Sequence, residues 1–260
     1  MRRLILEEPV SRAAILSRRV AVFACLTALA AIVAARASGG RDSLSALAVL
    51  AAALLLAGVA LLFAGAAAVE IWRTGRRGAA PALMGAALAL ALIAFPAFLT
   101  VQAARLPRIN QVTTDFKSPP QYMISLKARE ARGSWTPPAP GPEIEAAQRA
   151  AYPGLQPMLV DLEPEQAYRM ALRIVKDLGW RVVDANPPNL RGEAEGHIDA
   201  TDRSLFLGFI DDIAIRVRAQ GPKTQIDIRS ASRVGRHDFG ANARRAQRFI
   251  DAVQQSVSAR

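Results

Sequence analysis

The sequence predicts an α+β protein: three N-terminal transmembrane helices, then a β-α-β-β-β-β-α domain with an antiparallel sheet packed on helices. Three observations lead to this fold class. Hydrophobic residues make up 52% of the chain and crowd into its first part. A proline-rich stretch follows, and after it short alternating segments are flanked by two segments of helical periodicity. The chain therefore divides into a membrane region at 1–104, a connector at 105–154 and an extramembrane domain at 155–260.

The membrane region contains three apolar runs, which predict spans at about residues 20–37, 44–69 and 79–104. A helix needs roughly 20 apolar residues to cross the bilayer core. The first run also has features of a cleavable signal peptide, because it follows a basic leader and ends near Ala35-Arg36-Ala37. The interiors of the runs carry no Asp, Glu, Lys, Arg or His, which disfavours a transporter or pump.

Basic residues beside the spans predict which side of the membrane each loop occupies. With the N-terminus inside, eight basic residues flank the spans on the cytoplasmic side and five on the other side. Three crossings then place residues 105–260 outside the cytoplasm. The lipid bilayer is therefore the first partner that the sequence predicts.

The net charge of +11 does not indicate nucleic-acid binding. Residues 1–102 carry +6 of it, mostly beside the spans, and residues 103–260 carry +5 spread over a surface of mixed sign. The single cysteine, Cys25, excludes an intrachain disulfide and a cysteine metal site. The sequence has no phosphate-binding loop, dinucleotide-binding glycine pattern or zinc spacing, so we expect no cofactor and no metal.

The connector 105–154 is extended and rich in proline, with "GSWTPPAPGP" before a short helix at 143–151. In the following domain, a helix at 163–179 has proline in its first turn and glycine at its end. The closing helix carries apolar residues at 4-3-4-3-4 spacing, beginning at Phe239. The strands are expected at 157–162, 180–185, 190–202, 207–219 and 224–232.

The last two strands form a hairpin, for which we expect a turn at Gln220-Gly221. This turn places Ile213 opposite Ile228 on the buried face, and Asp211 next to Ser230 on that same face. On the other face, Asp212 lies opposite Arg229. Asp227 lies diagonal to Arg216 on the same face, and these charges are expected to form a solvated ladder.

A polar stretch after the hairpin, "RSASRVGRHDFGAN", holds the candidate site. We expect Asp211, Ser230, Ser232, Arg233 and Asn242 to converge where the hairpin meets the last helix. This corner is either a folding device or the floor of a binding site. The binding candidates are Asp211, Asp212, Arg229, Ser230, Ser232, Arg233, Arg236, His237, Asp238 and Asn242.

Three chemical roles were weighed for these residues. Asp238 is suited to capping the last helix. Ser230 or Ser232 with His237 and Asp238 has the residue types of a catalytic triad, although an adjacent His and Asp point apart at a corner of the chain. Asp211, Asp212, Asp238 and His237 supply ligands for a divalent cation.

The motifs "GFIDDIAIRV" and "DIRSASRVGRHDFGANARR", with "INQVTTDFKSPP" and "AAYPGLQP" upstream, resemble a family known as domain of unknown function 1499 (DUF 1499). The resemblance covers roughly residues 105–255. It implies a membrane-attached or exported bacterial protein and implies no activity.

The sequence thus predicts a multi-pass protein of the bacterial inner (cytoplasmic) membrane, with its C-terminal domain outside the cytoplasm. The function it favours is non-enzymatic binding of an envelope protein or an anionic ligand, with no nucleic-acid partner. The alternative is an envelope hydrolase that uses the Asp, Ser, Arg and His side chains of the polar corner.

Overall fold

The computed structural model describes residues 9–39, 42–132, 135–188, 195–204 and 207–259. The described chain forms two compact units. The first comprises the N-terminal helices up to Val101 with the short segment 205–208, and the second comprises 102–204 and 209–260.

The first unit is built from three long helices, α1 (Arg12–Ala37), α2 (Ser43–Thr74) and α3 (Ala79–Arg105). By length and composition, each is long and apolar enough to cross a membrane. Large apolar side chains such as Leu55 and Leu62 are exposed on their surfaces, as expected for helices whose solvent is lipid. The helices are longer than the predicted apolar runs. α1 begins before Arg18 and Arg19, and α2 continues to Thr74.

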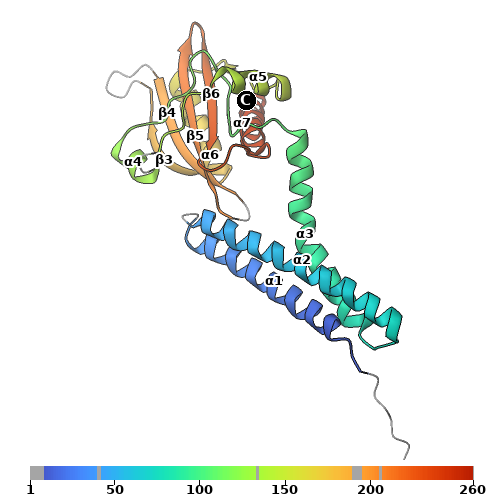
Figure 1. Cartoon of the computed structure of the whole chain (residues 1–260). Helices are drawn as coiled ribbons and strands as arrows, with labels where there is room; N and C mark the ends of the chain where they lie inside the picture. The colour runs from blue at the N-terminus through green and yellow to red at the C-terminus, as the bar shows by residue number, and fades with distance from the viewer. Residues whose placement is uncertain (1–8, 40–41, 133–134, 189–194, 205–206, 260) are drawn as a thin grey trace, which may run out of the picture. The chain divides into compact units, whose positions relative to one another are not determined.

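Small side chains hold α1 and α2 together, and the two helices run side by side (Figure 1). The buried residues of α1 recur with a strict alternation of three and four positions, which is the spacing of a coiled-coil seam. α2 repeats buried alanines at seven-residue intervals. At Gly85 of α3 an added Cβ would lie 2.2 Å from the Ser17 hydroxyl, so glycine permits the close approach of α1 and α3. The α1 seam consists of Ala14, Ser17, Ala21, Ala24, Ala28, Ala31 and Ala35.

The second unit contains an antiparallel sheet in the order β1-β6-β5-β4-β3, with β2 pairing with β6 beside β1. The two longest strands are β5 (Ile210–Gln220) and β6 (Lys223–Ser232), which are also central in the sheet. The strands that flank them are β1 (Gln111–Thr113), β2 (Met158–Val160), β3 (Arg181–Asn186) and β4 (Glu195–Arg203). From β2 onward, the predicted order β-α-β-β-β-β-α is confirmed.

Helices α6 (Pro164–Asp177) and α7 (Ala241–Ser258) cover one face of the sheet (Figure 1). The core between them contains Ile213 and Ile215 of β5, Ile226 and Ile228 of β6, and Phe249 of α7. Their burial is the main apolar stabilisation of the unit.

The other face of the sheet is covered by residues 114–132 and 135–138, which we call the strap. The strap includes helix α4 (Leu126–Arg132), and α5 (Pro142–Ala151) follows it. Tyr122 and Trp135 of the strap pack on Ala214 and Ala231 of the sheet. The segment that the sequence predicts as an extended connector is thus folded into the second unit, where it supplies a strand and a covering layer.

The hairpin register differs from the prediction. The turn lies at Gly221-Pro222, so Ile215 pairs with Ile228, and Ile213 pairs with Ser230. Each partner moves by two residues, which keeps every side chain on its predicted face because strand side chains alternate with period two. Gly221 has φ of 60°, a left-handed conformation that glycine adopts without strain.

Two other expectations are wrong. Asp227 and Arg229 are buried rather than solvated, because the strap covers their face of the sheet. Phe239 does not belong to the buried stripe of the last helix. It precedes α7, has φ of 53° and is 37% exposed, whereas Ala243, Ala246 and Ile250 are buried as predicted.

Candidate functional site

The polar corner lies between the sheet and α7, and its centre is Arg245. The guanidinium of Arg245 donates to Asp211 Oδ2 at 2.6 Å and to Asp202 Oδ2 at 2.8 Å. It also donates to Ser230 Oγ at 3.1 Å and to Asn242 Oδ1 at 2.8 Å. We define the polar corner as Asp202, Asp211, Ser230, Ser232, Asn242 and Arg245.

Asn242 connects the corner to β6 and to Asn110, the residue directly before β1. Its Oδ1 accepts the Ser230 hydroxyl at 2.7 Å, and its Nδ2 donates to Ser232 Oγ at 2.9 Å. The same Nδ2 donates to the Asn110 carbonyl at 3.0 Å. Asn242 and Ser230 are fully buried, so these bonds satisfy groups that water cannot reach.

Burial raises the pKa of Asp211, and the nearby Arg245 guanidinium offsets part of that rise. The pair is almost inaccessible to solvent, with side chains 4% and 6% exposed for Arg245 and Asp211. The buried side chains of this corner, all its members except Asp202, are hydrogen-bonded to one another. The geometry therefore supports the folding-device interpretation of the corner rather than an open ligand floor.

The remaining residues of the polar stretch lie apart from the corner. Asp238 accepts the backbone N–H groups of Gly240 at 2.8 Å and Asn242 at 2.9 Å, which confirms that it caps the last helix. His237 Nδ1 accepts the Phe239 N–H, and its Nε2 lies 3.2 Å from the Ala103 carbonyl. Arg236 is exposed in the turn.

The triad and cation arrangements are not formed by the described residues. The Ser230 hydroxyl is fully buried and donates to Asn242, while His237 makes its contacts elsewhere. Asp211 and Asp212 are consecutive strand residues, so their carboxylates point to opposite faces and do not converge on one ion. Among the described residues, no three His, Cys, Asp or Glu side chains lie together as a metal site requires.

Arg233 is not part of the polar corner, contrary to the expected convergence. Its guanidinium binds both oxygens of Asp212, at 2.7 and 2.8 Å, and donates to the Ala131 carbonyl of the strap at 3.1 Å. Asp212 is opposite Ala231 rather than Arg229 in the hairpin. Arg233 follows the end of β6. The alternation of side chains along the strand, which fixes the faces of Ser230 and Ser232, therefore does not determine where Arg233 points.

The strap side of the sheet contains a second buried network. Arg216 of β5 donates to Asp227 of β6 at 2.8 Å and to Asp115 of the strap at 3.0 Å. Arg229 lies over the Tyr122 ring, 5.0 Å from its centroid, and donates to Gln111 Oε1 at 2.9 Å. These contacts attach the strap to the two central strands.

Asp199 of β4 is a further buried carboxylate on the face of the sheet that the strap covers. Arg132 of the strap donates to Asp199 Oδ2 at 2.6 Å, and the Met123 N–H donates to the same oxygen at 2.9 Å. Asp199 Oδ1 is buried and has no partner among the described residues. Burial raises the pKa of Asp199 to about 6, against the opposing effect of Arg132. Burial likewise raises the pKa of Tyr122 far above its ordinary value.

A concave surface of about 570 Å³ adjoins the polar corner on its outer side. We call it the basic hollow, because four arginines and two aspartates line it. The exposed side chains of Arg203 and Arg248 form no ion pair with any residue in the described ranges, and Arg244 donates only to the Phe239 carbonyl at 2.9 Å. The lining residues are Asp202, Arg203, Ser204, Ala241, Arg244, Arg245, Gln247, Arg248 and Asp251.

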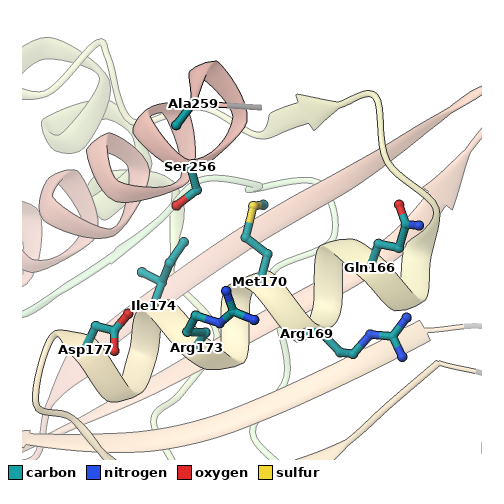
Figure 2. Close-up of a pocket in the computed structure, with 8 residues that line it drawn as sticks. All are labelled: Gln166, Arg169, Met170, Arg173, Ile174, Asp177, Ser256 and Ala259. Carbon is teal, nitrogen blue, oxygen red and sulfur yellow. The ribbon is translucent and has the colours of Figure 1, made fainter.

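A groove of about 460 Å³ lies between α6 and α7, away from all the predicted site residues. Figure 2 shows Met170 and Ile174 extending from α6 toward Ser256 of α7, while Arg169 points away. Arg169 is paired with Glu165 one turn earlier, at 3.0 Å. The groove therefore has an apolar floor and offers fewer unpaired cations than the basic hollow.

The family described as "Protein of unknown function (DUF1499)" matches residues 111–253, more than half of the chain. The chain belongs to this family. A comparison with curated proteins found no match. The matched DUF1499 segment begins at β1 and ends within α7, so it contains the strap, the sheet and both buried networks.

Sequence reasoning missed the residue at the centre of the DUF1499 polar corner. Arg245 follows Asn242 by three positions on a helix, which places both on one face and was the available signal. Arg132 was also missed as the partner of a buried carboxylate. Its signal is weaker, because the strap that brings Arg132 to Asp199 has no periodicity that predicts where it packs. The predicted proximity of Arg216 to Asp227 is confirmed, although the two residues pair directly and are buried.

Replacing Arg245 with methionine is expected to destabilise the protein by about 3–5 kcal/mol, because Asp211 would remain buried without its cation. Thermal and denaturant unfolding of the full-length protein in detergent would measure the loss. Arg173→Met on α6 is the matched control, since Arg173 is exposed, and it should change stability by no more than about 0.5 kcal/mol. Equal effects of the two substitutions would contradict the central role of Arg245.

Asp199 is expected to make stability decrease as the pH rises. Its pKa is about 6 in the fold, against 3.8 ordinarily, so the folded protein holds this proton more tightly than the unfolded chain. The stabilisation is complete below about pH 4 and is lost as the pH rises through 6, a change of about 3 kcal/mol.

Asp199→Asn removes this titration and keeps an acceptor for Met123. The stability of the wild type relative to this variant should therefore fall between pH 4 and pH 7 in equilibrium unfolding experiments. A constant difference across that range would show that Asp199 titrates at its ordinary pKa.

Proposed function

We propose that this DUF1499 protein is a multi-pass protein of the bacterial inner membrane whose sheet domain lies outside the cytoplasm and binds an anionic ligand without catalysis. The observation that carries the proposal is the basic hollow. Arg203, Arg244 and Arg248 line a concave surface and have no carboxylate partner among the described residues. Arginines without a carboxylate partner attract anions, because the planar guanidinium group presents several N–H donors that match the oxygen atoms of an oxyanion.

The closed polar corner supports binding rather than hydrolysis. A nucleophile must reach its substrate, and the candidate hydroxyl of Ser230 is fully buried against Asn242 and Arg245. The hollow, in contrast, presents exposed side chains on a fixed support. It thus offers recognition without the pair of nucleophile and base that hydrolysis requires.

The extracytoplasmic location is supported by the charge bias of the chain. Eight basic residues flank the apolar helices on the proposed cytoplasmic side, against five on the other. Three helices are long and apolar enough to cross a membrane. Three crossings would place the two ends of the chain on opposite sides of it. The bilayer and an anionic component of the cell envelope are the partners that follow from this arrangement.

A fusion of alkaline phosphatase to the C-terminus is expected to be active, because this enzyme matures only outside the cytoplasm. The same fusion placed after Thr74, between the second and third helices, should be inactive. Enzyme activity per fusion molecule in whole cells is the measurement. The reverse pattern would place the sheet domain in the cytoplasm and refute the proposed location.

Multivalent anions are expected to raise the thermal unfolding temperature of the full-length protein in detergent. Citrate, sulfate or phosphate would each replace chloride at constant ionic strength. A bound anion that adds about 1 kcal/mol should shift the midpoint by roughly 3 °C. A midpoint that depends on ionic strength alone, and not on the anion, would refute anion binding.

A further inference from the structure

We infer that the basic hollow is a phosphate site, in which Arg203, Arg244 and Arg248 bind the phosphate group of a ligand. This inference rests on the proposed anion-binding function and specifies its chemistry. The ligand is either inorganic phosphate or a lipid headgroup that ends in a phosphomonoester, and both present a group of up to two charges to the three arginines.

Neither carboxylate described in the hollow forms an ion pair with these three arginines. Asp202 accepts from the buried Arg245 at 2.8 Å, and Asp251 accepts from Gln247 at 2.8 Å. Arg245 in turn uses its donors within the polar corner. The positive charge that faces solvent in the hollow therefore comes from guanidinium groups whose donors are largely unused.

The spacing of the arginines favours an anion with more than one charge. Arg244 and Arg248 are four residues apart on α7, so they are neighbours on one helix face, where like charges repel. Arg203 joins them from the end of β4. A phosphate carries up to two charges and several acceptor oxygens, so it can accept from several guanidinium groups at once, which a single carboxylate does less well.

The other lining residues limit what the ligand carries beside the phosphate. Among the residues described around the hollow, none is aromatic, and Ala241 is the one apolar side chain. A nucleotide base would find no ring to stack on, and an acyl chain would find no large apolar side chain. Ser204 and Gln247 add neutral hydrogen-bonding groups, which suit a small polar headgroup or phosphate itself.

The two elements that carry the arginines are joined next to the hollow. Asp202 directly precedes Arg203, and Arg245 directly follows Arg244, so the Asp202–Arg245 ion pair ties the strand end to the first turns of the helix. The backbone N–H groups at the helix start are already used, since Gly240 and Asn242 donate to Asp238. Side chains rather than the helix terminus therefore make the site.

Titration calorimetry of the full-length protein in phosphatidylcholine nanodiscs, with inorganic phosphate as the probe, tests the inference. The wild type should bind phosphate saturably. The triple variant Arg203→Gln, Arg244→Gln, Arg248→Gln should raise the dissociation constant at least about tenfold, because each lost charge-assisted contact weakens binding. Arg248→Gln alone should weaken binding about threefold, which gives a second reading if the triple variant unfolds.

The control variant Arg169→Gln, Arg173→Gln, Arg181→Gln removes the same charge from exposed arginines outside the hollow and should bind like the wild type. Unchanged binding by the triple and single variants, or loss of binding by this control, overturns the phosphate site. Binding of citrate or sulfate without binding of phosphate also overturns it, and leaves the proposed anion binding intact. A protein that binds none of the three anions refutes both.

Nanodiscs that contain phosphatidic acid, whose headgroup is a phosphomonoester, distinguish the two sources of phosphate. If a lipid headgroup fills the hollow, inorganic phosphate should bind at least about threefold more weakly to the wild type in these discs than in phosphatidylcholine alone. If the ligand is soluble phosphate, the two affinities should agree. Either result supports the site when the triple variant has lost binding in both kinds of disc.

Discussion

The ion pair of Arg245 with Asp211 is the constraint on which the second unit, the sheet domain, depends. Asp211 lies on the core face of β5, in line with Ile213 and Ile215, where a carboxylate without a cation would cost several kcal/mol. An apolar helix face can pack on an apolar sheet in more than one position. With Arg245 on that face, α7 buries its charge only where the guanidinium meets Asp211. The buried charge thus selects one position for the closing helix, and Asn242 then fits between Ser230 and Ser232.

The opposite face of the sheet is closed by a different kind of contact, which explains why a proline-rich segment covers it. Arg229 donates to the carbonyls of Pro120, Pro137 and Pro138 as well as to a side-chain amide. Proline has a carbonyl but no N–H group, so such a segment can surround a buried cation with acceptors without adding donors that need partners of their own. The strap is therefore chemically matched to a sheet face that carries arginines. Its own charges, Asp115 and Arg132, complete the pairing at either end.

The sequence predicted those features that depend on local periodicity. The alternation of Ile213, Ile215, Ile226 and Ile228 identified the buried face, and proline and glycine located the ends of α6. The hairpin turn was misplaced by one residue, because Gln220-Gly221 and Gly221-Pro222 both offer a glycine and both keep the same faces. The burial of Asp227 and Arg229 was not predictable, since charges on one face of a strand normally indicate solvent. Only the strap, which has no repeating pattern, shows otherwise. In the candidate site, residue types were recognised but Arg245, their common partner, was not.

The pairing of β1 with β6 has a consequence for how the protein is made. Gln111 pairs with Ala231, so a strand that is synthesised early finds its partner only after nearly the whole domain has left the ribosome. The strap that follows β1 needs β5 and β6 in place to receive its charges, and the sheet needs α7 to cover Asp211. Contacts this distant in sequence close large loops and form slowly. The sheet therefore stays open after the three long apolar helices have been synthesised, which separates formation of these helices from folding of the sheet in time.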